Sequence, residues 1–174
     1  MVSGMRPFFA VLLATSLLAL PALAAQADLT GTWQIDEAAS ESMDEMLLAW
    51  GTPGFAVKMM KRLKTSLIIE QASGEITIRF KTGVYSYSDT LQPGTAVRTE
   101  KRYGNPVEKQ ERWLADGTLQ AQSWFDLKDG TRATTRSLKK LSDDGQVMVD
   151  FVTFTRADGS ELSARRIYRR QVED

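Results

Sequence analysis

Short β-branched and aromatic segments alternate with tight-turn signals from Thr65 almost to the end of the chain. Asp-Gly, Asn-Pro and other Gly-containing turns separate these segments, which is typical of β-hairpins. Each segment is therefore expected to pair with its sequence neighbour. A meander this long would leave exposed edges unless the sheet curled and closed. The pattern predicts an up-and-down β-barrel whose strands cover residues 65–71, 76–82, 84–91, 96–103, 107–114, 118–127, 131–141, 146–155 and 160–170.

Residues 29–37 form a further plausible strand, so the barrel is expected to have ten antiparallel strands. Between this segment and Thr65 lies the helical pattern of the chain. An apolar stripe at i, i+3, i+4 and i+7 predicts one helix, ended by Gly51; the stripe consists of Met43, Met46, Leu47 and Trp50. A second helix is predicted after Pro53. It is expected to bury Phe55, Met59, Met60 and Leu63 and to expose Lys58, Lys61, Arg62 and Lys64.

The first 24 residues have the pattern of a bacterial secretory signal peptide. A short start with Arg6 precedes an apolar stretch over residues 8–20, and residues 22–24 (Ala-Leu-Ala) supply small residues for cleavage. The apolar stretch is short for a membrane span. We expect cleavage after Ala24, a single mature domain over residues 25–174, and a periplasmic location.

Composition narrows the possible chemistry. The chain has no cysteine and no histidine, which excludes disulfides, thiolate metal sites, histidine-rich zinc sites and serine–histidine triads. It has 22 basic and 22 acidic residues, and removal of Arg6 with the signal peptide leaves 21 against 22, a net charge of −1. Such a balance does not favour nucleic acid. We therefore expect no metal, no cofactor, no catalytic residues and no enzymatic activity.

Several motifs in order resemble one family. They are "GTW" at residues 31–33, the helical pair at residues 43–60, "LIIE" at residues 67–70 and "RIY" at residues 166–168. This ordered set resembles the fatty-acid-binding proteins, which are intracellular lipid-binding proteins of the lipocalin-like calycin superfamily. The resemblance covers roughly residues 29–170. It implies a ten-stranded antiparallel barrel with a helix–turn–helix lid between the first two strands. The export signal and several longer loops depart from the family's pattern.

The resemblance also implies a ligand and a site. In the family, two arginines and a tyrosine inside the barrel bind the carboxylate of a fatty acid. Arg166 and Tyr168 match the pair on the last strand, and Arg136 matches the other arginine after a one-residue gap. A guanidinium suits this task because its planar donors meet a carboxylate bidentately and it stays charged.

Strand periodicity alone leaves the orientation of these arginines open. Arg165 and Arg166 are neighbours, so they point to opposite faces of a strand, whereas Arg166 and Tyr168 share a face. Either arginine could be a solvated surface residue. An arginine inside the barrel requires water, a ligand, or an internal carboxylate such as Asp126 or Asp150.

The two predicted helices carry a second set of candidate residues. Their apolar side chains could be ordinary core, or they could form a yielding portal for apolar ligands, because unbranched methionines adapt to varied shapes; the portal candidates are Met43, Leu47, Phe55 and Met59. The cations around Lys58 could simply be solvated. By analogy with the family, they could also contact an anionic membrane surface.

Two other functions remain open from the sequence. A lipocalin-like envelope protein would have a barrel filled by side chains and would act through its surface. An enzyme would have to use a carboxylate or a tyrosine inside the barrel. An empty cavity lined by apolar side chains would favour the carrier of a fatty acid, and a packed interior would favour the envelope protein.

Overall fold

The computed structural model describes residues 26–82, 86–94, 96–102 and 104–172. The predicted signal peptide and its cleavage site after Ala24 therefore lie outside the described residues. Within the described ranges, each helix is too short or too polar to cross a bilayer.

Ten strands and two helices occupy these ranges, and both helices lie between the first two strands, as predicted. The strands are β1 (Gly31–Ile35), β2 (Ser66–Ala72), β3 (Glu75–Lys81), β4 (Ser86–Leu91), β5 (Arg98–Arg102), β6 (Asn105–Trp113), β7 (Leu119–Asp126), β8 (Arg132–Leu141), β9 (Val147–Thr155) and β10 (Glu161–Arg170). The helices are α1 (Asp44–Ala49) and α2 (Gly54–Met60). We refer to the two helices together as the lid.

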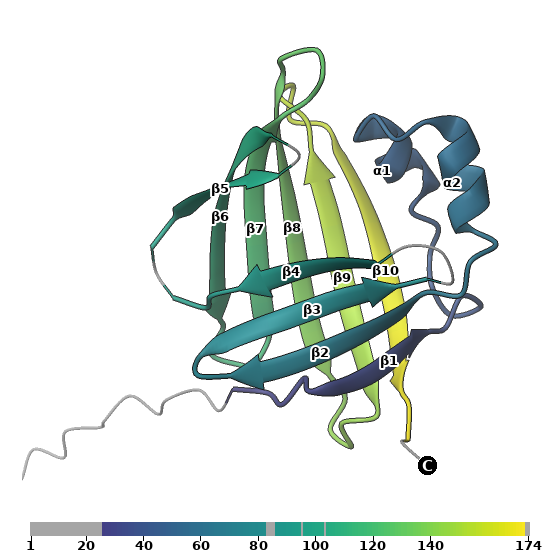
Figure 1. Cartoon of the computed structure of the whole chain (residues 1–174), viewed down its shortest axis with the longest axis vertical. Coiled ribbons are helices and arrows are strands. Elements are labelled where there is room, and N and C mark those ends of the chain that lie inside the picture. The colour runs from purple at the N-terminus through teal and green to yellow at the C-terminus, as the bar shows by residue number, and fades with distance from the viewer. Residues whose placement is uncertain (1–25, 83–85, 95, 103, 173–174) are drawn as a thin grey trace, which may run out of the picture.

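All ten strands belong to one antiparallel sheet in the order β4-β3-β2-β1-β10-β9-β8-β7-β6-β5. The first and last strands pair in its middle, so β4 and β5 form its two edges. The sheet curls until β1–β4 cross in front of β6–β10, with the lid at one end beside β10 (Figure 1). The result is a barrel with one gap, between β4 and β5, which we call the seam.

Two apolar clusters fill different parts of the barrel. The larger cluster surrounds Trp33, which is fully buried, and draws its side chains mainly from β1–β4 with contributions from Met148 and Tyr168. The smaller cluster lies under α1, where Met46 packs with Ala133, Phe154 and Ala164. Met46 therefore faces the core, as the predicted stripe requires.

Trp33 contacts both the segment before β1 and the end of β10. Its indole Nε1 donates a hydrogen bond to the carbonyl oxygen of Leu29 at 2.8 Å, and the Arg170 guanidinium lies 4.4 Å from its ring centroid. Gly31 has a φ of +138°, and a Cβ at this position would lie 3.1 Å from Arg170 Nη1. Glycine is therefore required by both the backbone conformation and the close approach of Arg170.

The predicted burial of α2 is wrong for most of its apolar residues. Phe55 is 75% exposed, Met59 is 52% exposed and Met60 is 47% exposed, whereas Val57 is buried. Leu63 is only half-buried. Apolar residues lie all round this two-turn helix, so periodicity could not select the face that packs inward. The helix packs through Val57 and leaves an apolar surface in solvent.

Candidate functional site

The strand register settles the orientation of the paired arginines. Along β10, Ala164 and Tyr168 are buried while Arg165 is exposed, so the even-numbered residues face the barrel interior. Arg166 lies on this inner face with Tyr168. It stands opposite Asp150 of β9, which in turn stands opposite Lys139 of β8. The inner face thus carries a row of three charged residues.

Arg166 makes contact with the segment that precedes the lid. Its Nη1 donates to the carbonyl oxygen of Glu41 at 2.9 Å, and its Nη2 lies 3.5 Å from both carboxylate oxygens of Glu37. The side chain is 15% exposed. Its Nε is buried and has no hydrogen-bond partner. One donor of this guanidinium is therefore still available inside the protein.

Tyr168 is buried beside this arginine. Desolvation raises the pKa of its phenol well above the ordinary value, and the negative charge of Asp150 acts in the same direction, while Arg166 opposes both. The phenol consequently remains protonated throughout the neutral range, where its hydroxyl can donate a hydrogen bond.

A buried ion pair completes the charged row. Lys139 Nζ lies 2.8 Å from Asp150 Oδ2, and Ser137 Oγ lies 2.6 Å from both Lys139 Nζ and Asp150 Oδ1. Asp150 is one of the two carboxylates that the sequence suggested as an internal partner. Lys139 was missed, although its inward position follows from strand parity once the register of β8 is known.

Arg136 and Asp126 lie elsewhere. Arg136 is exposed on the outer face of β8, on the opposite side from Ser137. The structure therefore does not bring Arg136 together with Arg166 and Tyr168, because the one-residue shift in alignment reverses the face of a strand. Asp126 is also exposed and forms an ion pair with Arg132 at 3.3 Å.

Part of the inner wall beside the cluster under α1 is only half-buried. On β7, β8 and β9, the inward-facing positions Ser123, Thr135 and Val152 all retain some exposure, as does Leu162 on β10. Solvent therefore reaches inward-facing side chains next to the row of Arg166, Asp150 and Lys139. Both polar and apolar side chains line this wall, which suits a ligand that has both characters.

The portal candidates divide into two groups. Met43 packs against the cluster under α1, and Leu47 is half-buried. Phe55, Met59 and Lys58 of α2 are exposed. Of these candidates, only those at the first helix thus cover the barrel.

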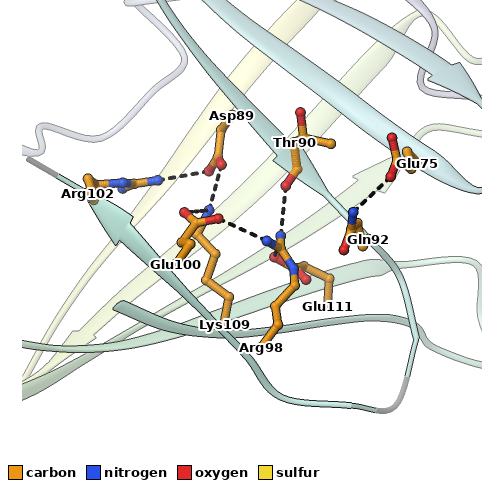
Figure 2. A network of polar contacts seen from close by, with 9 residues as sticks. All are labelled: Glu75, Asp89, Thr90, Gln92, Arg98, Glu100, Arg102, Lys109 and Glu111. Carbon is orange, nitrogen blue, oxygen red and sulfur yellow. Dashed lines mark hydrogen bonds and ion pairs between the residues drawn. The ribbon is translucent and has the colours of Figure 1, made fainter. Parts of the chain in front are cut away.

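The seam is joined by side chains in place of a strand ladder (Figure 2). Lys109 of β6, only 2% exposed, bonds to Asp89 of β4 at 2.5 Å and to Glu100 of β5 at 2.7 Å. Arg98 of β5 donates to the carbonyl oxygen of Thr90 at 2.7 Å and to Glu111 at 2.9 Å.

These contacts combine three cations with three carboxylates. The sixth member, Arg102, bonds to Asp89 at 2.9 Å. Desolvation raises the pKa of the buried Glu111, although Arg98 acts against this shift. In the part of the chain that the structure describes, no carboxylate cluster is arranged to hold a metal ion. Because ion pairs join β4, β5 and β6 across the gap, the seam network closes the barrel electrostatically.

Solved structures with the same architecture identify the fold. The chain is similar to a protein named REP1-NXSQ fatty acid transporter, at 16% identity and a TM-score of 0.64, over 84% of this chain and 98% of that one. It is similar to fatty-acid-binding protein 1 of Echinococcus granulosus, at 17% identity and a TM-score of 0.64, over 83% of this chain and 98% of that one. It is also similar to a Schistosoma mansoni fatty-acid-binding protein solved in complex with arachidonic acid, at 17% identity and a TM-score of 0.60, over 82% of this chain and 96% of that one.

The chain therefore has the fold of the fatty-acid-binding proteins, as its motifs predicted. No protein-family model matches its sequence, and no curated protein matches it at a significant level.

Replacing Lys109 with methionine should destabilise the protein by about 1–3 kcal/mol, because Asp89 and Glu100 would each lose one of their two cationic partners. Urea unfolding monitored by tryptophan fluorescence measures this change. Lys140→Met is the matched control, since Lys140 and Asp116 form a surface pair that solvent screens. Equal stability of the two variants would mean that the seam network contributes nothing to closure.

Proposed function

We propose that this protein binds and carries a small hydrophobic carboxylate, such as a fatty acid, inside its barrel. Arg166 and Tyr168 hold the head group, and the apolar chain lies along the inner wall under the lid. Binding alone is the activity, and no bond of the ligand is made or broken.

This proposal depends on the unpaired Nε of Arg166. A buried Nε without an acceptor is costly for a free protein, because the donor has lost its hydration. A carboxylate oxygen would satisfy it with a charge-assisted hydrogen bond. The protonated phenol of Tyr168, on the same face of β10, provides a second donor to the same head group.

The charge balance of the inner row supports an anionic ligand. Lys139 and Asp150 neutralise each other at 2.8 Å. Glu37 lies at 3.5 Å from Arg166, but its side chain is mostly in solvent. Within this row, Arg166 is therefore the cation whose charge is only weakly compensated. A carboxylate would complete the balance.

The ligand's tail supplies most of the affinity. Burial of each methylene contributes about 0.8 kcal/mol. The half-buried inner wall favours this carrier over a lipocalin-like envelope protein with a filled barrel. An enzyme using Ser137 and Lys139 is disfavoured, because both side chains are already hydrogen-bonded to Asp150.

Arg166→Gln should weaken the binding of a fatty acid by about 1.5–3 kcal/mol, roughly ten- to a hundredfold, which is the range for a hydrogen bond to a charged group. The alcohol of the same chain length should lose much less, because it carries no charge for Arg166 to bind. Titration calorimetry with both ligands measures the difference.

Arg165→Gln is the matched control, since Arg165 lies on the outer face of the same strand. An equal loss for acid and alcohol in Arg166→Gln would show that Arg166 does not bind the head group. It would then affect binding only through its hydrogen bond to Glu41, in the segment that precedes the lid. No loss for either ligand would remove the head-group anchor from the proposal.

We further propose that α2 contacts an anionic membrane surface while ligand is exchanged. Phe55 and Met59 are exposed apolar side chains that could insert among lipids, and Lys58 lies between them in sequence. Lys61 is committed to an ion pair with Asp44 of α1, so the remaining cations are the ones available to phospholipid.

The double variant Lys58→Glu/Lys64→Glu should transfer ligand more slowly to anionic vesicles, with an unchanged affinity in solution, because peripheral charges act on encounter. A fluorescent fatty acid and quencher-labelled vesicles measure the rate at low and high salt. Lys101→Glu/Lys140→Glu carries the same charge change on β5 and β8. If both double variants behave alike, the face of α2 is only solvated.

We propose that the protein carries its ligand in the periplasm, because residues 1–24 have the pattern of a secretory signal peptide. Protein produced with its full sequence in a Gram-negative host should fractionate with the periplasm, and amino-terminal sequencing should begin at Ala25. Recovery from the cytoplasm with an intact amino terminus would contradict both expectations.

A further inference from the structure

The indole N–H of Trp50 is buried and has no hydrogen-bond acceptor. Trp33 provides a contrast within the same protein, since its Nε1 is satisfied by the Leu29 carbonyl at 2.8 Å. A phenylalanine at position 50 would supply a similar apolar ring without burying a donor. The unpaired donor therefore calls for a partner other than the protein.

Trp50 lies over the cluster of apolar side chains under α1. It is the residue that ends α1, and its ring packs edge-on against Phe154 of β9, with centroids 6.3 Å apart and an interplanar angle of 77°. Met46 and Leu162 belong to the same cluster under the lid. The indole is only half-buried as a whole, so its surroundings are not completely filled by protein.

A second unpaired donor, Arg166 Nε, lies further along the same wall. Phe154 pairs with Leu162 of β10, and Arg166 follows Leu162 by four residues on the same inner face. At the rise of an antiparallel strand, this separation is about 13 Å. Ala164 and Val152, both apolar, lie between the two donors. The wall thus presents a charged donor, an apolar stretch and a neutral donor.

We propose that the ligand is an acyl carboxylate with a second oxygen near the middle of its chain, as a hydroxyl or a keto group, and that Trp50 Nε1 donates to this oxygen. This inference rests on the proposed function, because Arg166 must hold the carboxylate for the second oxygen to reach Trp50. A plain saturated chain would leave the indole donor unpaired. Trp50 is therefore a specificity-determining residue.

The experiment compares octadecanoate with its mid-chain hydroxy and keto derivatives on the wild-type protein and on Trp50→Phe, by titration calorimetry. The preference of the wild type for an oxygenated acid over octadecanoate should fall by about two- to tenfold in Trp50→Phe, the range for one neutral hydrogen bond. The affinity for octadecanoate itself should change little, because the aromatic ring is retained.

Trp113→Phe is the matched control. This tryptophan packs against the cluster around Trp33 and not against the cluster under α1, so its replacement should leave the preference unchanged. An unchanged preference in Trp50→Phe would overturn the inference while leaving the carrier function intact. Failure of the wild type to bind any of the three acids would overturn the proposed function and the inference with it.

A second measurement does not depend on the folding of a variant. In wild-type protein with ¹⁵N-labelled tryptophan, the indole N–H signal of Trp50 should shift downfield and exchange more slowly with water when the keto acid is added. Octadecanoate should not slow this exchange to the same degree. Identical behaviour with both acids would show that Trp50 does not recognise the second oxygen.

Discussion

The pairing of β1 with β10 is the constraint on which the remaining structure depends. It joins the two ends of the described chain through only three register pairs, Trp33 with Arg170, Gln34 with Arg169 and Ile35 with Tyr168. Without it, β1–β4 and β5–β10 would be two separate antiparallel sheets. Contacts of such high sequence separation carry a large loop-closure cost. Burial of Trp33 and the stacking of Arg170 on its ring offset part of that cost.

Closing the chain at β1 and β10 moves the unpaired edges to β4 and β5. These strands are consecutive in sequence, yet ion pairs join them where backbone hydrogen bonds would be expected. Exposed edges invite pairing with other chains, and charged side chains are a common protection against it. The seam network thus serves two purposes: it holds the edges near one another and it makes both unattractive to further strands.

The interior divides according to the same geometry. Apolar side chains gather around Trp33 and under α1, while Arg166, Asp150 and Lys139 lie in one row across β10, β9 and β8. Lys139 and Asp150 satisfy each other, so the row leaves Arg166 as the group that most needs an anion. The sheet therefore supplies an apolar lining and a cationic anchor, Arg166, on the same wall, which is the chemistry that the proposed function requires.

The sequence by itself determined the strands, because turn residues are local properties of the chain. A period of two also placed Arg166 and Tyr168, which the family resemblance singled out, on one face. The expected pairing of each strand with its sequence neighbour was wrong for β4 and β5, which form the two edges of the sheet. The sequence could not determine which face of β10 points inward. Parity separates Arg165 from Arg166 but does not orient either, and the one-residue gap that was used to align Arg136 was enough to misplace it. Only the tertiary structure brought Lys139 to Asp150, placed Lys109 across the seam and turned Phe55 toward solvent. Those outcomes depend on long-range pairing and on how a short helix packs, and neither leaves a periodic signal in the sequence.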